Sequence, residues 1–261
     1  MIRALNTAAT GMQAQETMVN TISNNIANAN TNGFKSSRTE FEDLLYETQK
    51  ESGDKTSAGS EHTVGQQIGS GSAVSGIKKE MDQGSPLITS NPYDLMIQGE
   101  GFFGVMGPNE EILYTRDGSL TVSAQGELTT KKGLKIYPGI TLPAETSHLN
   151  IAEDGSIEAF VKGQKDPVIA GKIPIFTFMN SVGLKSMGGN LYSMTVGSGA
   201  PSEQVAGRGI AGAIQQGAIE SSNVNVMNEM TNLIKAQRSY EMNSKVMGIA
   251  DQMLQTINNL K

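Results

Sequence analysis

The segment that most restricts the fold of this chain is its C-terminal end, from Glu220 to Lys261. It contains no proline and a single glycine, Gly248. Within it, large side chains recur at every seventh position, at Val226, Leu233, Tyr240, Met247 and Leu254. Because seven residues make close to two turns of α-helix, these five side chains form one seam. The segment therefore predicts a long amphipathic helix whose apolar stripe needs a partner.

The N-terminal segment, from residue 2 to about residue 28, shows the same spacing. Its large residues at every seventh position are Leu5, Met12, Val19 and Ile26. The matching seams predict that the two terminal helices pair in a coiled-coil-like manner, within one subunit or between subunits. Two core-packing helices of an ordinary domain would also show this spacing, because four or five heptad-like repeats are only moderately specific.

Asparagines are concentrated at the end of the N-terminal helix, between Ser23 and Lys35. Gly33 is a natural helix-ending residue, since glycine adopts left-handed conformations without strain. The asparagines exceed what a helix end requires. Either they lie in a solvated loop, or their amides satisfy polar groups at a buried contact without the desolvation cost of a charge.

Between the terminal segments, the composition changes twice. Phe41, Leu44 and Leu45 predict a short helix over about residues 38–49. Glycine, serine and threonine then dominate residues 51–76, which predicts an extended linker. From residue 77 onward, short apolar runs alternate with turn dipeptides such as Asp117-Gly118 and Asp154-Gly155. This spacing indicates an antiparallel β domain, not βαβ units.

The predicted fold class is therefore α+β, with an antiparallel all-β domain inserted between paired terminal helices. The expected parts are an N-terminal helix over 1–35, a short helix and extended linker over 36–76, the β domain over 77–218 and the C-terminal helix over 219–261.

Composition argues against several functional classes. The net charge of -6 makes nucleic acid an unfavourable partner, because no basic stripe is present to neutralise phosphates. The absence of cysteine excludes disulfides, thiolate metal sites and thiol nucleophiles. The two histidines, His62 and His148, lie in polar, loop-like surroundings. We expect no membrane span, because no apolar run approaches the roughly 20 residues that one requires.

Two segments match the glycine pattern of dinucleotide-binding loops, at residues 99–104 and 207–212. Such a loop joins a strand to a helix, and neither segment is expected to have both neighbours, so we interpret them as bends. The carboxylates are scattered, at Asp94, Glu100, Asp117, Glu127 and Asp154. Nothing in the sequence places two of them across a cleft, as a glycoside hydrolase requires. We therefore expect no catalytic residue, no cofactor and no metal site.

Several segments together carry a resemblance to a known family. Residues 24–35 resemble the N-terminal signature of bacterial flagellar rod and hook proteins, and residues 220–226 and 237–241 resemble its C-terminal signature. Residues 99–103 and 114–118 resemble its central β domain. The match covers nearly the whole chain. One departure is Leu120, where members of the family more often carry phenylalanine.

The resemblance implies a structural role and no enzymatic activity. Chain length and the residues from Phe41 to Tyr46 are most similar to distal rod members, which implies a subunit of a hollow, helically assembled drive shaft that transmits torque and lets exported subunits pass. The implied partners are further copies of the chain, proximal rod proteins, the hook protein and the surrounding ring proteins. The implied location is the periplasm-spanning basal body, reached by type III export without a cleaved signal peptide.

We expect the subunit interfaces to use the two helical seams together with residues of the N-terminal signature. The expected interface residues are Leu5, Met12, Val19, Ile26, Asn30, Thr31, Gly33, Phe34, Val226, Leu233, Tyr240, Met247 and Leu254. The alternatives are a proximal rod or hook component of the same family and, more remotely, a secreted β-domain carbohydrate binder or hydrolase. Assembly-dependent ordering of the termini would distinguish a rod subunit from a secreted binder with a folded, protease-resistant monomer.

Overall fold

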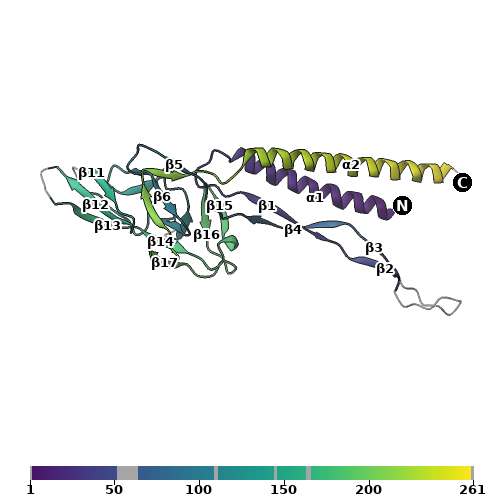
Figure 1. Ribbon diagram of the computed structural model, residues 1–261, viewed down its shortest axis with the longest axis horizontal. Helices are drawn as coiled ribbons and strands as arrows, with labels where there is room; N and C mark the ends of the chain where they lie inside the picture. The colour runs from purple at the N-terminus through teal and green to yellow at the C-terminus, as the bar shows by residue number, and fades with distance from the viewer. Residues whose placement is uncertain (1, 52–63, 109–110, 144–145, 163–165, 260–261) are drawn as a thin grey trace. The chain divides into compact units, whose positions relative to one another are not determined.

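The computed structural model describes residues 2–51, 64–108, 111–143, 146–162 and 166–259. The chain divides into two compact units, each described here by itself. The helical unit comprises residues 1–27, 37–79 and 225–261, and the β unit comprises residues 28–36 and 80–224. The expectation of two terminal helices with a mostly antiparallel β domain between them is confirmed (Figure 1).

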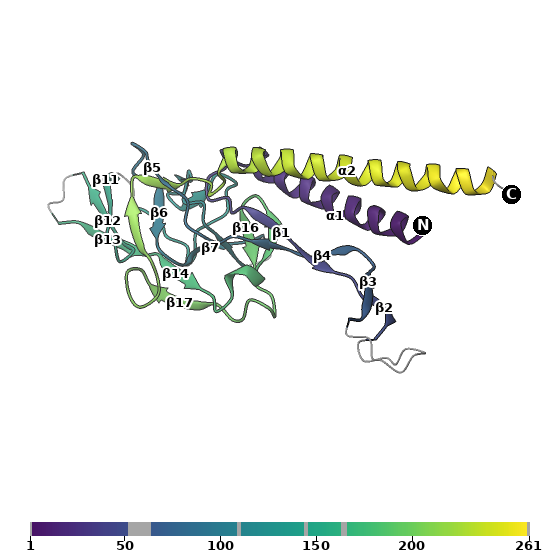
Figure 2. The same ribbon diagram turned by 45° about the vertical axis from the view of Figure 1, so that its right-hand side comes forward.

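Two long helices dominate the helical unit, α1 (Ile2–Ala27) and α2 (Val226–Asn259). They lie side by side and run in opposite directions, so that the first turn of α1 and the last turn of α2 are at the same end of the pair (Figures 1 and 2). Asn225 caps α2, because its side-chain oxygen accepts hydrogen bonds from the backbone N–H groups of Met227 at 3.1 Å and Asn228 at 3.2 Å.

The predicted short helix over residues 38–49 is wrong. This segment forms strands β1 (Ser37–Asp43) and β2 (Tyr46–Lys50), which pair antiparallel with β4 (Ser72–Lys79) and β3 (Gln66–Gly69), respectively. The helix-like spacing of Phe41, Leu44 and Leu45 was misleading. Phe41 and Leu45 are exposed, so they form no buried helix stripe, and the backbone is held extended by its hydrogen bonds to β4 and β3. Most of the described part of the predicted linker is thus paired strand, and residues 52–63 lie outside the described residues.

The β unit contains a six-stranded antiparallel sheet with the order β15-β16-β8-β7-β14-β17. Its strands are β7 (Phe102–Met106), β8 (Ile112–Thr115), β14 (Pro174–Thr177), β15 (Lys185–Gly188), β16 (Leu191–Ser193) and β17 (Ser202–Val205). A three-stranded sheet consists of β11 (Thr146–Ile151), β12 (Ser156–Val161) and β13 (Val168–Lys172). Three two-stranded pairs consist of β9 (Leu120–Val122) with β10 (Leu128–Thr130), β6 (Leu95–Gln98) with β18 (Ala213–Gln216), and β5 (Pro86–Ile88) with β19 (Ala218–Glu220). A short 3-10 helix spans Ser181–Gly183.

The β unit has two hydrophobic clusters, and strands of the six-stranded sheet contribute to both. Successive side chains of a strand point to opposite faces. Phe103 on β7 and Ile175 on β14 therefore join a large aliphatic cluster, whereas their neighbours Phe102 and Phe176 join an aromatic one. In the aromatic cluster, the rings of Tyr114 and Phe176 pack edge to face with centroids 5.3 Å apart.

The glycine pattern at residues 99–104 has a structural explanation in the β unit. Gly99 and Gly101 adopt φ angles of 113° and 130°, which side chains rarely tolerate. A Cβ atom on Gly104 would lie 2.5 Å from the ring of Phe176. The pattern therefore reflects two backbone bends and one close packing contact.

Candidate assembly surface and buried ion cluster

Helices α1 and α2 meet through small side chains. Ala8 and Ala14 of α1 and Ala236 and Ala250 of α2 are all buried. Halfway along the contact, a Cβ atom on Gly11 would lie 2.8 Å from the side-chain nitrogen of Asn243. Ala236, Asn243 and Ala250 are themselves seven residues apart, so the close approach follows one line along α2, formed by two alanines and an asparagine whose side chain fills the space beside Gly11.

The predicted seam of large residues lies at one edge of this contact. Leu233, Met247 and Leu254 of α2 are half-buried, whereas Val226 and Tyr240 are 39% and 45% exposed. The predicted seam residues of α1 are also half-buried, namely Leu5, Met12, Val19 and Ile26. On an α-helix, a shift of three residues turns the direction of a side chain by about 60°, which separates the large-residue seam of α2 from its Ala236 line.

A second consequence is that α2 keeps many large apolar side chains in solvent. They occur along its whole length and include Met227, Met230, Ile234, Met242, Val246, Ile249, Met253 and Ile257, each about half exposed or more. Scattered apolar residues are normal on a protein surface, but an extended apolar face marks an interaction site. Together with Val226 and Tyr240, these eight residues are spread around most of the circumference of α2 that α1 does not cover and do not form a single stripe. We refer to the ten residues as the exposed apolar face of α2.

Asn25 connects α1 to strand β1 and is buried. Its side chain donates to the backbone oxygen of Ser37 at 2.8 Å and accepts from the Ser37 N–H at 2.9 Å. The same amide donates to Glu229 Oε2 of α2 at 3.3 Å. Of the two interpretations of the asparagine-rich segment, a satisfied buried amide is correct for Asn25, whereas Asn30 is exposed.

In the β unit, three buried charges form an ion cluster. The Lys35 ammonium lies 2.6 Å from Glu220 Oε1, and the Arg116 guanidinium donates to Glu220 Oε2 at 3.3 Å. The side chains of Lys35 and Glu220 are each 1% exposed and that of Arg116 is 5% exposed. The cluster thus holds two cations around one carboxylate in a place that water does not reach.

Neighbouring backbone groups form further hydrogen bonds with the side chains of this ion cluster. Lys35 also donates to the Asp82 backbone oxygen at 2.6 Å, and Arg116 donates to the Gly99 backbone oxygen at 2.9 Å. The backbone N–H of Gly84 donates to Glu220 at 2.9 Å. Arg116 Nε finds no hydrogen-bond partner among the described residues.

The environment lowers the basicity of both cations. Burial lowers the pKa of Lys35 below its usual value, and the Glu220 carboxylate opposes that shift. Burial likewise lowers the pKa of Arg116. Since one carboxylate faces two cations, Glu220 is the group on which the charge balance of the cluster depends.

The ion cluster joins the two terminal signature segments inside the β unit. The Gly33 N–H donates to the Glu220 backbone oxygen at 2.8 Å, and the Asn223 side chain accepts from the Ser36 N–H at 2.8 Å. Gly33 has a φ of 66°, and a Cβ atom there would lie 2.8 Å from the backbone of Arg116 and Asp117. Of the predicted interface residues, Gly33 is therefore buried in its own chain, while Thr31 and Phe34 are half-buried.

The sequence did not predict the ion cluster, although its three residues lie in the segments that carry the family resemblance. Lys35 and Glu220 are the last and first residues of the two signature segments, and Arg116 precedes the Asp117-Gly118 turn. The available signal was limited to Lys35 and Glu220, each of which is the single charge of its segment, because Arg116 stands beside the charged Asp117.

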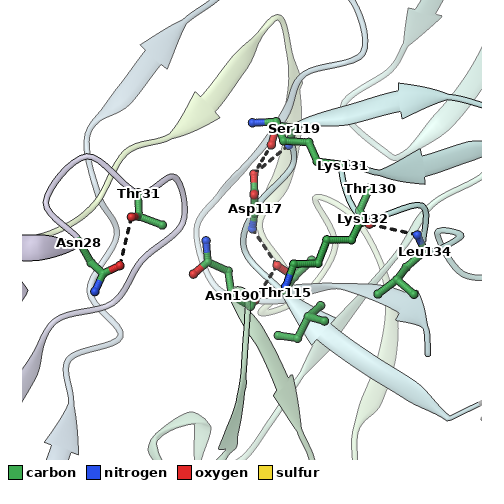
Figure 3. Close-up of a pocket in the computed structure, with 12 residues that line it drawn as sticks. Asn28, Thr31, Thr115, Asp117, Ser119, Thr130, Lys131, Lys132, Leu134 and Asn190 are labelled. Atoms are coloured by element: carbon green, nitrogen blue, oxygen red, sulfur yellow. Dashed lines mark hydrogen bonds between the residues drawn. The ribbon is translucent and has the colours of Figure 1, made fainter. Parts of the chain in front are cut away.

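A pocket of about 300 Å³ lies beside the Asp117 turn (Figure 3). Its walls come from the loop after β8, the turn after β10, the turn before β16 and residues 28–31. Asp117 accepts hydrogen bonds from Ser119, and the Thr115 hydroxyl donates to the Asn190 backbone oxygen at 2.8 Å. These polar groups are bound to one another, so they hold the loops in shape.

The other candidate sites considered from the sequence have structural roles. Asp154 pairs with Lys172 at 2.8 Å on the surface, and Glu127 pairs with Lys135 at 2.7 Å. His148 packs beside the Phe160 ring, and His62 lies outside the described residues. Over the described ranges, no three metal-ligating side chains come together, and neither helix carries an apolar stretch long enough to cross a membrane.

Three family models match successive parts of the chain, one at the N-terminal helix, one in the β unit and one at the C-terminal helix. Residues 5–35 match the model "Flagella basal body rod protein", residues 96–159 match "Flagellar hook protein FlgE/F/G D1 domain", and residues 215–260 match "Flagellar basal body rod FlgEFG protein C-terminal". The first match contains most of α1, the last match contains all of α2, and the central match lies in the β unit.

Curated relatives extend this similarity to the full length. The chain is 43% identical over 260 residues to the flagellar basal-body rod protein FlgG of Buchnera aphidicola, with all of both chains covered. It is 42% identical over 261 residues to FlgG of Caulobacter vibrioides, again with full coverage. Among solved structures, the Helicobacter pylori flagellar hook protein FlgE2 is 15% identical with a TM-score of 0.24, covering 71% of this chain and 43% of that one.

Proposed function

Because the chain belongs to the FlgG family of flagellar basal-body rod proteins, we infer that it is a structural subunit of the distal rod of the flagellum. It is not an enzyme, and it assembles within the rod and hook complex of the basal body.

We propose that the chain polymerises with copies of itself into an open helical tube. The observation that carries this proposal is the exposed apolar face of α2, which remains in solvent after α1 and α2 have packed. A head-to-tail contact whose rotation does not close generates a filament. At about 1.5 Å per residue, α2 is on the order of 50 Å long and can touch several neighbours, which suits a shaft that must resist twisting.

We propose that the predicted interface residues of the two helical seams contribute to this contact between copies. Val226 and Tyr240 are exposed and face neighbouring copies directly. The half-buried seam residues support the helix pair from its edge and contribute their exposed parts, namely Leu5, Met12, Val19, Ile26, Leu233, Met247 and Leu254. In the assembled rod, the helix pairs adopt a coiled-coil-like arrangement with those of adjacent subunits.

We further propose that the rod crosses the periplasm and that the chain reaches it through the flagellar export apparatus with its N-terminus uncleaved. Proximal rod proteins and the hook protein contact its two ends, and ring proteins surround it. Intact mass of the chain isolated from basal bodies tests the export proposal, since loss of an N-terminal peptide would contradict it.

Electron microscopy of basal bodies from cells that lack this chain tests the function. We expect truncated rods without hooks, and re-expression of the chain should restore complete rods. Complete rods with hooks in the deletion strain would contradict the assignment to the distal rod.

A further inference from the structure

Methionine is concentrated in the exposed apolar face of α2. Four of the ten residues of this face are methionines, and they are between 49% and 74% exposed, namely Met227, Met230, Met242 and Met253. Met227 precedes Ala236 by nine residues, or about two and a half turns, so it projects away from α1. The four side chains are therefore accessible to reagents in solution as long as no other chain covers α2.

A thioether differs from the other apolar groups of this face because it can be oxidised reversibly. Hydrogen peroxide transfers one oxygen atom to the sulfur, so that the O–O bond breaks, an S–O bond forms and water leaves. The sulfur loses two electrons, which reduce the peroxide. The product, methionine sulfoxide, is polar and uncharged, and sulfoxide reductases convert it back to methionine. The neighbouring Val246 and Ile249 have no sulfur and do not react in this way.

The effect of this oxidation depends on whether α2 has a partner. Within one chain these positions face solvent, so a sulfoxide there keeps its hydrogen bonds with water and leaves the fold intact. A contact between copies would remove that water, and a polar group buried without a partner costs free energy.

We propose that the four methionines of α2 form a redox-sensitive assembly switch. Oxidation by a peroxide leaves the subunit folded but unable to join the rod, and reduction of the sulfoxides makes it competent again. This inference rests on the proposed function, because only assembly covers this face.

Other methionines of the same chain serve as internal controls. Met96 is 1% exposed and should resist oxidation as long as the β unit is folded. Met179 and Met194 of the β unit are 99% and 59% exposed, so in the free chain they should react as readily as the methionines of α2. They lie outside the proposed contact between copies.

The chemical step is measured on the full chain by peptide mass spectrometry. The purified chain and intact basal bodies are treated with the same concentration of hydrogen peroxide, and the sulfoxide at each methionine is followed with time. We expect the four methionines of α2 to oxidise at least about fivefold more slowly in basal bodies than in the free chain, because susceptibility follows exposure. Equal rates in the two samples would overturn the proposal, and so would sulfoxides that reductases of both epimer specificities fail to remove from the free chain.

The consequence for assembly is measured in cells with a sulfoxide mimic. Glutamine has a side chain of similar length to methionine and ends in a neutral polar group. We expect the fourfold variant Met227→Gln, Met230→Gln, Met242→Gln and Met253→Gln to reduce the number of complete rods by about tenfold, because its amides must be desolvated at the contact. Circular dichroism of the purified variant should show normal folding. The matched control is Met179→Gln with Met194→Gln, which should leave rods complete.

The outcomes separate the switch from the rod function. Complete rods with the fourfold variant, or an equal loss of rods with the control variant, would overturn the switch and leave the rod function intact. Complete rods in the deletion strain would instead overturn the function itself.

Discussion

Lys35 and Glu220 lie 185 positions apart in the chain, yet their side chains meet at 2.6 Å and are each 1% exposed. The contact brings the segment that follows α1 into the β unit beside the strand that precedes α2. Removing one partner of a buried pair is costly because the other charge then stays unpaired in a medium of low dielectric constant. The ion cluster therefore makes the β unit depend on both terminal segments.

The first prediction concerns Glu220→Gln, which leaves Lys35 and Arg116 without their shared carboxylate. We expect the free energy of unfolding of the β unit to fall by about 3–5 kcal/mol. Urea denaturation followed by circular dichroism measures this loss. The control is Glu127→Gln, which removes the partly exposed pair with Lys135 and should cost about 1 kcal/mol or less. Equal losses in the two variants would contradict the importance of the cluster.

The second prediction concerns alkaline pH. Burial, reinforced by the negative charge of Glu220, raises the pKa of Tyr192 to about 12. The folded state then keeps a proton that the unfolded chain loses near pH 10, so stability is complete below pH 10 and declines as the pH rises toward 12. The decline from this group is about 1.4 kcal/mol for each pH unit in that window. Tyr192→Phe should remove this component, and identical pH slopes for both proteins would exclude it.

The third prediction concerns the close approach of the helices. Ala236→Leu places a large side chain in the contact between α1 and α2, which should destabilise the helix pair by about 1–3 kcal/mol. Gly248 lies on the same helix with open space around its Cβ position. Gly248→Ala should therefore stabilise α2 by about 1 kcal/mol. Thermal loss of helical circular dichroism measures both changes, and a stabilising Ala236→Leu would refute the small-residue contact.

The fourth prediction separates backbone strain from collision at Gly33. Gly33→Ala should destabilise the β unit by more than about 3 kcal/mol, since it combines left-handed strain with a clash against the Arg116 backbone. Gly133 has a φ of 78° with no atom near its Cβ position, so Gly133→Ala should cost about 1–2 kcal/mol from strain alone. Denaturation midpoints of the two variants test the difference, which should vanish if Gly33 is needed for its φ angle alone.

The fifth prediction addresses assembly. Tyr240→Asp puts a charge on the exposed apolar face of α2, where the single chain does not bury it. We expect normal folding of the chain but short or missing rods and loss of motility, because the charge must be desolvated at a subunit interface. Gln237→Asp, at an exposed polar position of the same helix, is the control. Motility assays and electron microscopy check both variants, and complete rods with Tyr240→Asp would count against this face as an interface.

The sequence alone determined the two terminal helices and the β domain between them. Helix hydrogen bonds join residues four apart, so the heptad spacing of Leu233 or Met12 and the absence of proline are sufficient local evidence. The turn dipeptides at Asp117 and Asp154 likewise report local backbone geometry.

Tertiary structure decided what depends on residues far apart in the chain. Residues 38–49 became strands because β4 and β3 supply hydrogen-bond partners, which helix-like spacing around Phe41 could not reveal. The face of α2 that packs on α1 is set by the small residues that allow close approach, including Ala236, and not by the large-residue seam. The ion cluster forms because folding brings Lys35, Arg116 and Glu220 to one buried point, and no local pattern encodes that meeting.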